Sequence, residues 1–149
     1  MIPELCIGST RTILLEMPFE QWQTSMTEDI FSLLERGFCV VLAHIERYEP
    51  FQRNRTAWKS ILALPVFKQI NAGSFLKPRH LSGLITYSRI RSFCLDFLQE
   101  HPETILGTDC HNLSTRSPNL AAARSVITER LGQEILSRTD KTVCKALEL

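Results

Sequence analysis

Residues 39–48, CVVLAHIERY, are the stretch of this 149-residue sequence that decides the fold. The stretch opens with an uninterrupted apolar run, residues 39–43, and becomes polar at His44 and Glu46. A short apolar run is typical of a strand buried on both faces, as strands of a parallel sheet are. A second stretch, residues 104–112, repeats this form, because the run TILG is followed by TDCHN. We therefore expect two buried strands that each end in polar side chains.

Similar apolar runs alternate with amphipathic stretches along the rest of the sequence. A helical pattern follows each run, and a further helix is expected at the end of the chain. This alternation predicts an α/β fold whose parallel strands are joined by crossover helices on the outer face. The expected strands are residues 12–15, 39–43, 68–71 and 104–107.

Helix boundaries are predicted from capping residues. Ser25 with Glu28 has the spacing of a capping box, and Ser117 is followed by proline, which favours an N-cap at that serine. Gly37 and Gly132 follow helical patterns directly and are the predicted helix stops.

Composition excludes several classes of protein. A formal net charge of +1 with 22% charged residues gives no basic surface of the kind that binds nucleic acid. The sequence has neither an apolar run long enough for a membrane span nor the start of a signal peptide. Its five scattered cysteines favour a reduced, cytoplasmic protein. The length predicts a single domain over residues 1–149.

Polar side chains follow the ends of all four expected strands. Because the carboxyl ends of parallel strands meet at one edge of a sheet, we expect these side chains to share a site. Imidazole and carboxylate groups are the ligands of metal ions that activate water, so the pattern predicts a metal-dependent hydrolase. The residues are Glu16, His44, Asn71, Asp109 and His111.

Each of these residues also has an ordinary structural interpretation. His44 could cap its strand through a backbone hydrogen bond, and Asp109 could cap the turn before the next helix. Glu16, a carboxylate that ends an apolar strand, could pair with Arg47 or Arg11. We prefer the metal interpretation because four strands end in the same way.

Arg47 and Arg116 are the candidate anion-binding residues. Each lies a few residues beyond an expected ligand, and the planar guanidinium group suits phosphate oxygens. Their local sequence alone would make both of them surface arginines. His80, on a long loop, and His101, in a turn, are weaker candidates for the site.

Four motifs resemble those of a known family. LLEMPF, LAHIERYEPFQ, QINAGSF and GTDCHN are similar, in order and spacing, to the later motifs of the bacterial PHP-type protein-tyrosine phosphatases. These are the manganese-dependent enzymes of capsular and exopolysaccharide operons. The resemblance implies a distorted (β/α)7 barrel with a trinuclear metal centre, of which this chain would form a part.

The resemblance also assigns roles to individual residues. Positions that match the family's metal ligands are Glu16, His44, Asp109 and His111, and the implied metal is Mn²⁺, with Fe or Zn²⁺ as alternatives. Arg47 and Arg116 match the family's phosphate-side arginines and are therefore the expected catalytic residues. Asn71 and Asn112 match positions that line the site.

The sequence departs from the family at its start. Members begin with a strand bearing His-x-His and carry further ligands before the position of Glu16, and none of these is present here. We therefore expect a PHP-like domain truncated at its N-terminus, with an incomplete metal cluster. Free strand edges would favour association of the chain with itself.

The expected function is hydrolysis of phosphotyrosine in proteins, with a bacterial tyrosine kinase of polysaccharide synthesis as substrate. Two alternatives remain open. One is another PHP phosphoesterase, such as a histidinol-phosphate phosphatase. The other is an inactive or weakly metal-binding remnant, which the missing His-x-His motif favours.

Overall fold

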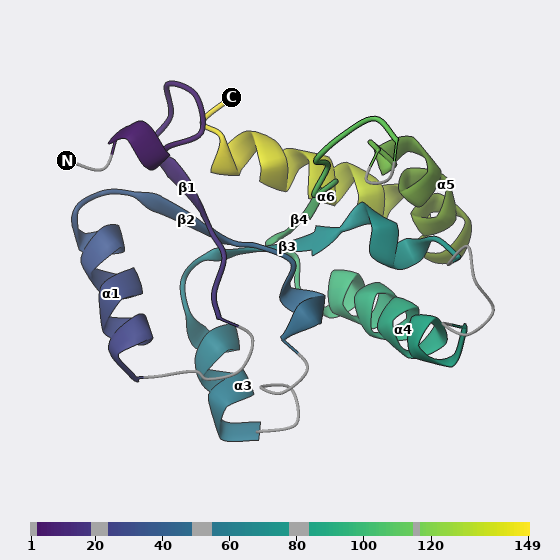
Figure 1. Ribbon diagram of the computed structural model, residues 1–149, viewed down its shortest axis with the longest axis horizontal. Helices are drawn as coiled ribbons and strands as arrows, with labels where there is room; N and C mark the ends of the chain where they lie inside the picture. The colour runs from purple at the N-terminus through teal and green to yellow at the C-terminus, as the bar shows by residue number, and fades with distance from the viewer. Residues whose placement is uncertain (1–2, 19–23, 49–54, 78–83, 115–116) are drawn as a thin grey trace.

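Strands and helices alternate along the chain as the sequence predicts (Figure 1). The computed structural model describes residues 3–18, 24–48, 55–77, 84–114 and 117–149. The strands are β1 (Thr12–Leu15), β2 (Cys39–Leu42), β3 (Phe67–Asn71) and β4 (Thr104–Gly107). The helices are α1 (Thr24–Glu35), α3 (Arg55–Ala63), α4 (Leu84–Glu100), α5 (Leu120–Leu131) and α6 (Gln133–Ala146), with short 3-10 helices η1 (Pro3–Leu5), η2 (Ile45–Arg47) and η3 (Ala72–Phe75).

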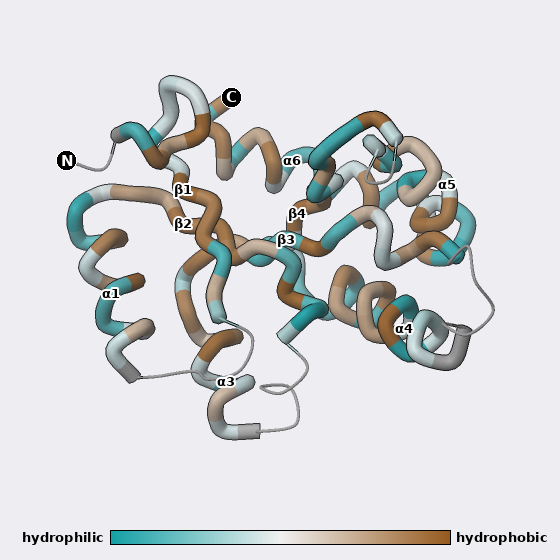
Figure 2. Tube along the Cα trace, in the orientation of Figure 1, coloured by the Kyte–Doolittle hydropathy of each residue, from teal (hydrophilic) through white to brown (hydrophobic). Residues whose placement is uncertain are grey.

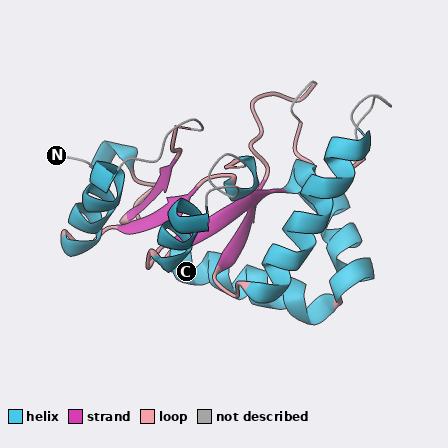
Figure 3. Ribbon diagram, turned by 90° about the horizontal axis from the view of Figure 1, so that it is seen from below, coloured by secondary structure: helices cyan, strands magenta, loops and turns pink. Residues whose placement is uncertain are grey.

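The four strands form one twisted parallel sheet in the order β1-β2-β3-β4 (Figure 3). Each strand lies beside its predecessor in the sequence, which a crossover helix between successive parallel strands allows. β1 and β4 are the edge strands, so the described residues form an open sheet and not a closed barrel. The α/β class is confirmed, and the barrel remains a prediction.

One face of the sheet packs against α1, α3 and α4. Strand residues such as Val40, Leu42 and Ile70 alternate toward this side, where they meet Ile30 of α1 and Ile61 of α3 in one buried cluster. Apolar residues accordingly concentrate along the strands and on the inner sides of these helices (Figure 2). Burying an isoleucine of this kind stabilises the fold by about 2–3 kcal/mol, so this layer carries much of the stability.

Helix α6 departs from the predicted outer layer, because it crosses the amino-terminal ends of the strands. Thr142 donates a hydrogen bond to the carbonyl of Pro102, and Lys145 pairs with Glu103 at 2.9 Å, both just before β4. At the other end of α6, the buried Thr12 hydroxyl of β1 donates to the carbonyl of Ala146. α6 therefore lies on the opposite side of the strands from α1 and α3 (Figure 1).

Glycines end two helices as predicted, whereas the predicted N-caps are wrong. Gly37 has a φ of 76° and donates to Leu34 O, which gives α1 the left-handed end that glycine permits. Gly132, with a φ of 88°, ends α5. α1 already begins at Thr24, so Ser25 lies inside it and cannot be its cap. The N-cap of α5 is Asn119 and not Ser117.

Lys68 of β3 shows how closely the helical layer fits the sheet. Its side chain is buried, and its ammonium group donates to Leu64 O at 2.8 Å, just beyond the end of α3. Helix ends carry unsatisfied carbonyls and partial negative charge, both of which favour a cation. Burial lowers the pKa of the Lys68 ammonium.

Two further observations concern membrane spans and disulfides. Among the described residues, none of the helices is long and apolar enough to cross a membrane. No disulfide joins the five cysteines, all of which lie in the described residues.

Candidate metal and phosphate site

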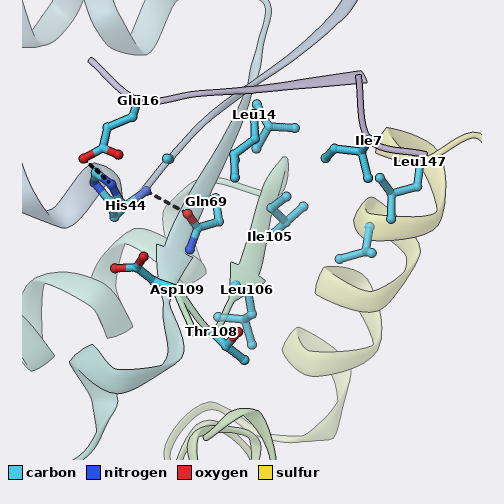
Figure 4. A pocket seen from close by; sticks show the side chains of 14 residues that line it. Ile7, Leu14, Glu16, His44, Gln69, Ile105, Leu106, Thr108, Asp109 and Leu147 are labelled. Carbon is cyan, nitrogen blue, oxygen red and sulfur yellow. Dashed lines mark hydrogen bonds and ion pairs between the residues drawn. The ribbon is translucent and has the colours of Figure 1, made fainter. Parts of the chain in front are cut away.

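Three of the predicted site residues, Glu16, His44 and Asp109, lie near one another just beyond the carboxyl ends of strands (Figure 4). Glu16 directly follows β1, His44 follows β2 after Ala43, and Asp109 follows β4 after Thr108. A cavity of about 420 Å³ is lined by all three side chains. Its remaining walls are largely apolar side chains from the sheet, from α6 and from the residue after α6, including Leu14, Ile105, Leu106, Val143 and Leu147. The expectation that these three side chains lie together is met, and their role as a metal site remains a prediction.

His44 and Glu16 form the first pair of candidate ligands. The His44 imidazole is buried, and its Nε2 lies 3.1 Å from Glu16 Oε1. The backbone of His44 is left-handed, with a φ of 36°, which an L-residue adopts only at an energetic cost. Tyr48 packs edge-on against the imidazole at 6.3 Å and accepts a hydrogen bond from the Met17 amide. Burial raises the pKa of Tyr48 to about 12, so the phenol stays protonated.

Asp109 and His111 form the second pair. Asp109 Oδ1 lies 3.1 Å from His111 Nε2, although β4 ends at Gly107 and neither residue belongs to the strand. Asp109 Oδ2 accepts a hydrogen bond from Arg47 Nη2 at 2.8 Å and another from Asn71 Nδ2 at 3.1 Å. The Asp109 backbone is also left-handed, with a φ of 50°. Strained backbone at both His44 and Asp109 is typical of functional positions.

Of the two candidate anion-binding residues, Arg47 lies within the described part of the chain. Its guanidinium group bonds Asp109 while 44% of its side chain stays exposed, so it can also receive a ligand from solvent. The prediction for Arg116 lies outside the described residues, as does that for His80. His101 stacks on Phe97 with ring centroids 4.1 Å apart, at the far end of α4 from the site.

Gln69, which was not among the predicted residues, lies between these pairs, and Glu46, which was noted only as a polar residue after the second strand, lies beside them. Gln69 is buried, and its Oε1 accepts a hydrogen bond from the His44 amide at 2.8 Å. Its Nε2 donates to Asn71 Oδ1 at 2.8 Å. Glu46 Oε1 accepts from the Ser74 hydroxyl at 2.7 Å and from the Asn71 amide, and burial raises the pKa of this carboxyl. The available signal was a glutamine within an apolar strand, where a polar group needs a partner.

The donor types fit a divalent metal ion. One imidazole and one carboxylate in each pair are the ligands that Zn²⁺, Mn²⁺ and Fe²⁺ accept. Within the part of the chain that the structure describes, no three His, Cys, Asp or Glu side chains gather closely enough to hold an ion. The predicted ligands therefore form two pairs at one sheet edge and not a closed shell.

Comparison with known proteins places the chain in a family. A parallel α/β sheet with imidazole and carboxylate groups at its strand ends is an architecture of metal-dependent hydrolases. Residues 3–144 match the family model described as capsular polysaccharide synthesis, CpsB/CapC. The chain belongs to this family, which confirms the resemblance of its motifs.

Individual relatives show how much of such a protein the chain represents. Tyrosine-protein phosphatase CpsB of Streptococcus agalactiae is 27% identical over 128 residues, which are 86% of this chain and 52% of the relative. Tyrosine-protein phosphatase YwqE of Bacillus subtilis is 24% identical over 131 residues, 88% of this chain and 49% of the relative. The chain thus spans about half the length of the curated relatives it matches.

A solved structure supports the fold. It comes from crystal structures of YwqE from Bacillus subtilis and CpsB from Streptococcus pneumoniae, described as unique metal-dependent tyrosine phosphatases. The match has a TM-score of 0.75 and 23% sequence identity, and it covers 94% of this chain and 54% of the solved chain. The chain therefore shares the arrangement of its strands and helices with about half of that structure.

Proposed function

We propose that this chain carries part of the active site of a metal-dependent protein-tyrosine phosphatase. The observation that carries the proposal is the meeting of His44, Asp109 and Arg47 at one edge of the sheet, where ligand types for a metal lie beside a cation for phosphate. The names of the relatives, which are tyrosine-protein phosphatases, support the same class. We further propose Mn²⁺ as the metal, with Fe or Zn²⁺ as alternatives, and a cytoplasmic location.

In this proposal the residues divide into two groups. Glu16, His44, Asp109 and His111 would hold the metal, which when bound supplies a Lewis acid and an activated water. Arg47 would bind two oxygens of the phosphate group, orient the ester and neutralise charge on its oxygens. The bond from Arg47 to Asp109 holds the guanidinium beside the metal ligands before substrate arrives.

The proposed substrate is a phosphotyrosine-containing protein, with a bacterial tyrosine kinase as the specific candidate. Arg116 keeps its proposed role beside Arg47, although it lies outside the described residues. A bidentate arginine recognises the phosphate and does not by itself choose the amino acid that bears it. Selectivity for tyrosine therefore has to be measured.

Metal binding and hydrolysis together test this function. Mn²⁺ binding to the 149-residue chain is measured by electron paramagnetic resonance, and phosphate release is measured with phosphotyrosine peptide, phosphoserine peptide and histidinol phosphate. We expect about one weakly held ion, because four candidate ligands complete the shell of one ion at most. We expect slow, metal-dependent release that is selective for phosphotyrosine.

Variants assign these effects to the site. Asp109→Ala should abolish both metal binding and phosphate release, whereas Arg47→Ala should keep the metal and lose release. Arg130→Ala, which removes an exposed arginine of α5, is the matched control and should change neither. Unchanged metal binding in Asp109→Ala, or a preference for histidinol phosphate, would show that the proposed function is wrong.

A further inference from the structure

We propose that Gln69 is a positioning residue that couples the two pairs of candidate metal ligands, and that Gly107 makes its position possible. The inference rests on the proposed metal-dependent function. Its structural basis is a run of hydrogen bonds, which we call the amide bridge, from the His44 amide through Gln69 and Asn71 to Asp109. The bridge connects the ends of β2, β3 and β4, which no ligand side chain does by itself.

The direction of the amide bridge is fixed at its first bond. A backbone N–H can only donate, so Gln69 must present its oxygen to His44 and its NH2 group to Asn71. Asn71 then accepts through Oδ1, which leaves its own NH2 group to donate to Asp109. A carboxylate can only accept, so the bridge ends with the correct polarity. Every bond in it depends on the orientation of the Gln69 amide.

The two ends of the bridge are the residues with the least favourable backbone conformations in the site. His44 and Asp109 both have positive φ, and such conformations persist only where surrounding contacts hold them. Gln69 holds the His44 amide directly, and through Asn71 it holds the Asp109 carboxylate. Because Gln69 and Asn71 are both buried, water cannot readily replace these bonds. The geometry of one ligand pair therefore depends on that of the other.

Gly107 of β4 explains why the Gln69 side chain can lie where it does. Asn71 and Gly107 are paired across β3 and β4, and the Gln69 side chain lies over the glycine. A Cβ at residue 107 would lie 2.6 Å from Gln69 Nε2 and 2.9 Å from its Cδ. Any other residue at this position would force the Gln69 amide to shift from the place where it bonds Asn71. The glycine is needed for the amide bridge and not for a turn, because its backbone is that of a strand.

A double-mutant cycle tests the link between these two residues. Gln69→Ala, Gly107→Ala and the double variant are compared by Mn²⁺ affinity, with Gln99→Ala on the exposed side of α4 as the control. Residues that orient metal ligands typically contribute 10- to 100-fold to affinity, so we expect about that loss in each single variant. The double variant should be no weaker than Gln69→Ala alone, because the added methyl group has nothing left to displace. Losses that multiply would overturn the role assigned to Gly107.

A second measurement needs neither metal nor activity. Hydrogen exchange of the His44 amide in the metal-free protein reports the first bond of the bridge, and thermal melting confirms that each variant is folded. Gln69→Leu should speed this exchange, while the conservative Gln69→Glu keeps the acceptor and should leave it slow. Gln69→Glu loses the donor to Asn71, so its Mn²⁺ affinity should still fall.

The outcomes separate this inference from the proposed function. Unchanged His44 exchange in Gln69→Leu would overturn the positioning role, whatever the metal data show. Failure of the wild-type chain to bind Mn²⁺ would refute the proposed function, and faster His44 exchange in Gln69→Leu would still support the bridge. Full Mn²⁺ affinity in Gln69→Glu would overturn the coupling to Asp109.

Discussion

Replacing Ile70 separates the stability of the protein from the geometry of its site. Ile70 lies in the central strand β3, is fully buried and belongs to the core cluster between the sheet and the helices. Its neighbours Gln69 and Asn71 point to the other face, because side chains alternate along a strand. A change at Ile70 should therefore weaken the fold and leave the site arrangement in place.

The size of the effect follows from the burial. Ile70→Ala removes three buried carbon atoms from a packed position and should lower the free energy of unfolding by about 2–5 kcal/mol. At about 2–4 °C per kcal/mol for a domain of this size, a loss of about 3 kcal/mol lowers the melting temperature by about 6–12 °C. Ile70→Val, which removes one carbon, should cost about 0.5–1.5 kcal/mol.

Urea unfolding followed by circular dichroism measures these losses, and hydrogen exchange of the His44 amide measures the site. We expect the stability order wild type, Ile70→Val, Ile70→Ala, with local exchange at His44 unchanged under conditions where all three proteins are folded. A loss below about 1 kcal/mol in Ile70→Ala would refute the packing argument. Faster local exchange at His44 would refute the separation of the two faces.

Three further predictions concern other parts of the chain. Burial against Phe97 lowers the pKa of His101, so the unfolded state binds the proton more tightly. Stability should therefore fall as the pH drops from 6.5 through the lowered pKa, and urea titrations of His101→Phe should lack this loss. Leu14 on the edge strand β1 is 51% exposed, so we expect the chain to associate with itself. Light scattering at micromolar concentration should detect this association, and Leu14→Lys should weaken it. A monodisperse wild-type monomer would contradict the prediction. The exposed Cys110 should react with iodoacetamide, while Cys94, buried and with a raised pKa, should not. Cys110→Ser should keep metal-dependent phosphate release, and its loss would indicate a cysteine nucleophile.

The strands were predictable because they depend on local sequence, and the gathering of the candidate residues at one sheet edge was predictable because the strands are parallel. β1 and β4 have the predicted bounds, since each is an apolar run with polar residues on either side. The positions of His44 and Asp109 followed from the rule that parallel strands end at one edge. Neither the bounds of these strands nor the positions of His44 and Asp109 depend on how individual side chains pack.

Features that depend on distant contacts were not predictable. The pattern of α6 shows that it has an apolar side, but it does not show that this helix crosses the strand ends near Pro102. Gln69 and its partner His44 are 25 residues apart, and nothing in either local sequence pairs them. The N-cap at Ser117 was wrong because α5 begins after Asn119, and a serine-proline pair also suits an extended approach to a helix.

The hydrogen bond from Thr12 to Ala146 has a mechanical consequence. It joins residues 134 positions apart and fastens the first strand of the sheet to the last turn of α6. Pulling Thr12 away from Ala146 would load this bond together with the edge pairing of β1 with β2. Detachment of β1 would carry Glu16 away from His44. The geometry of the candidate ligand pair therefore depends on a contact at the opposite end of β1.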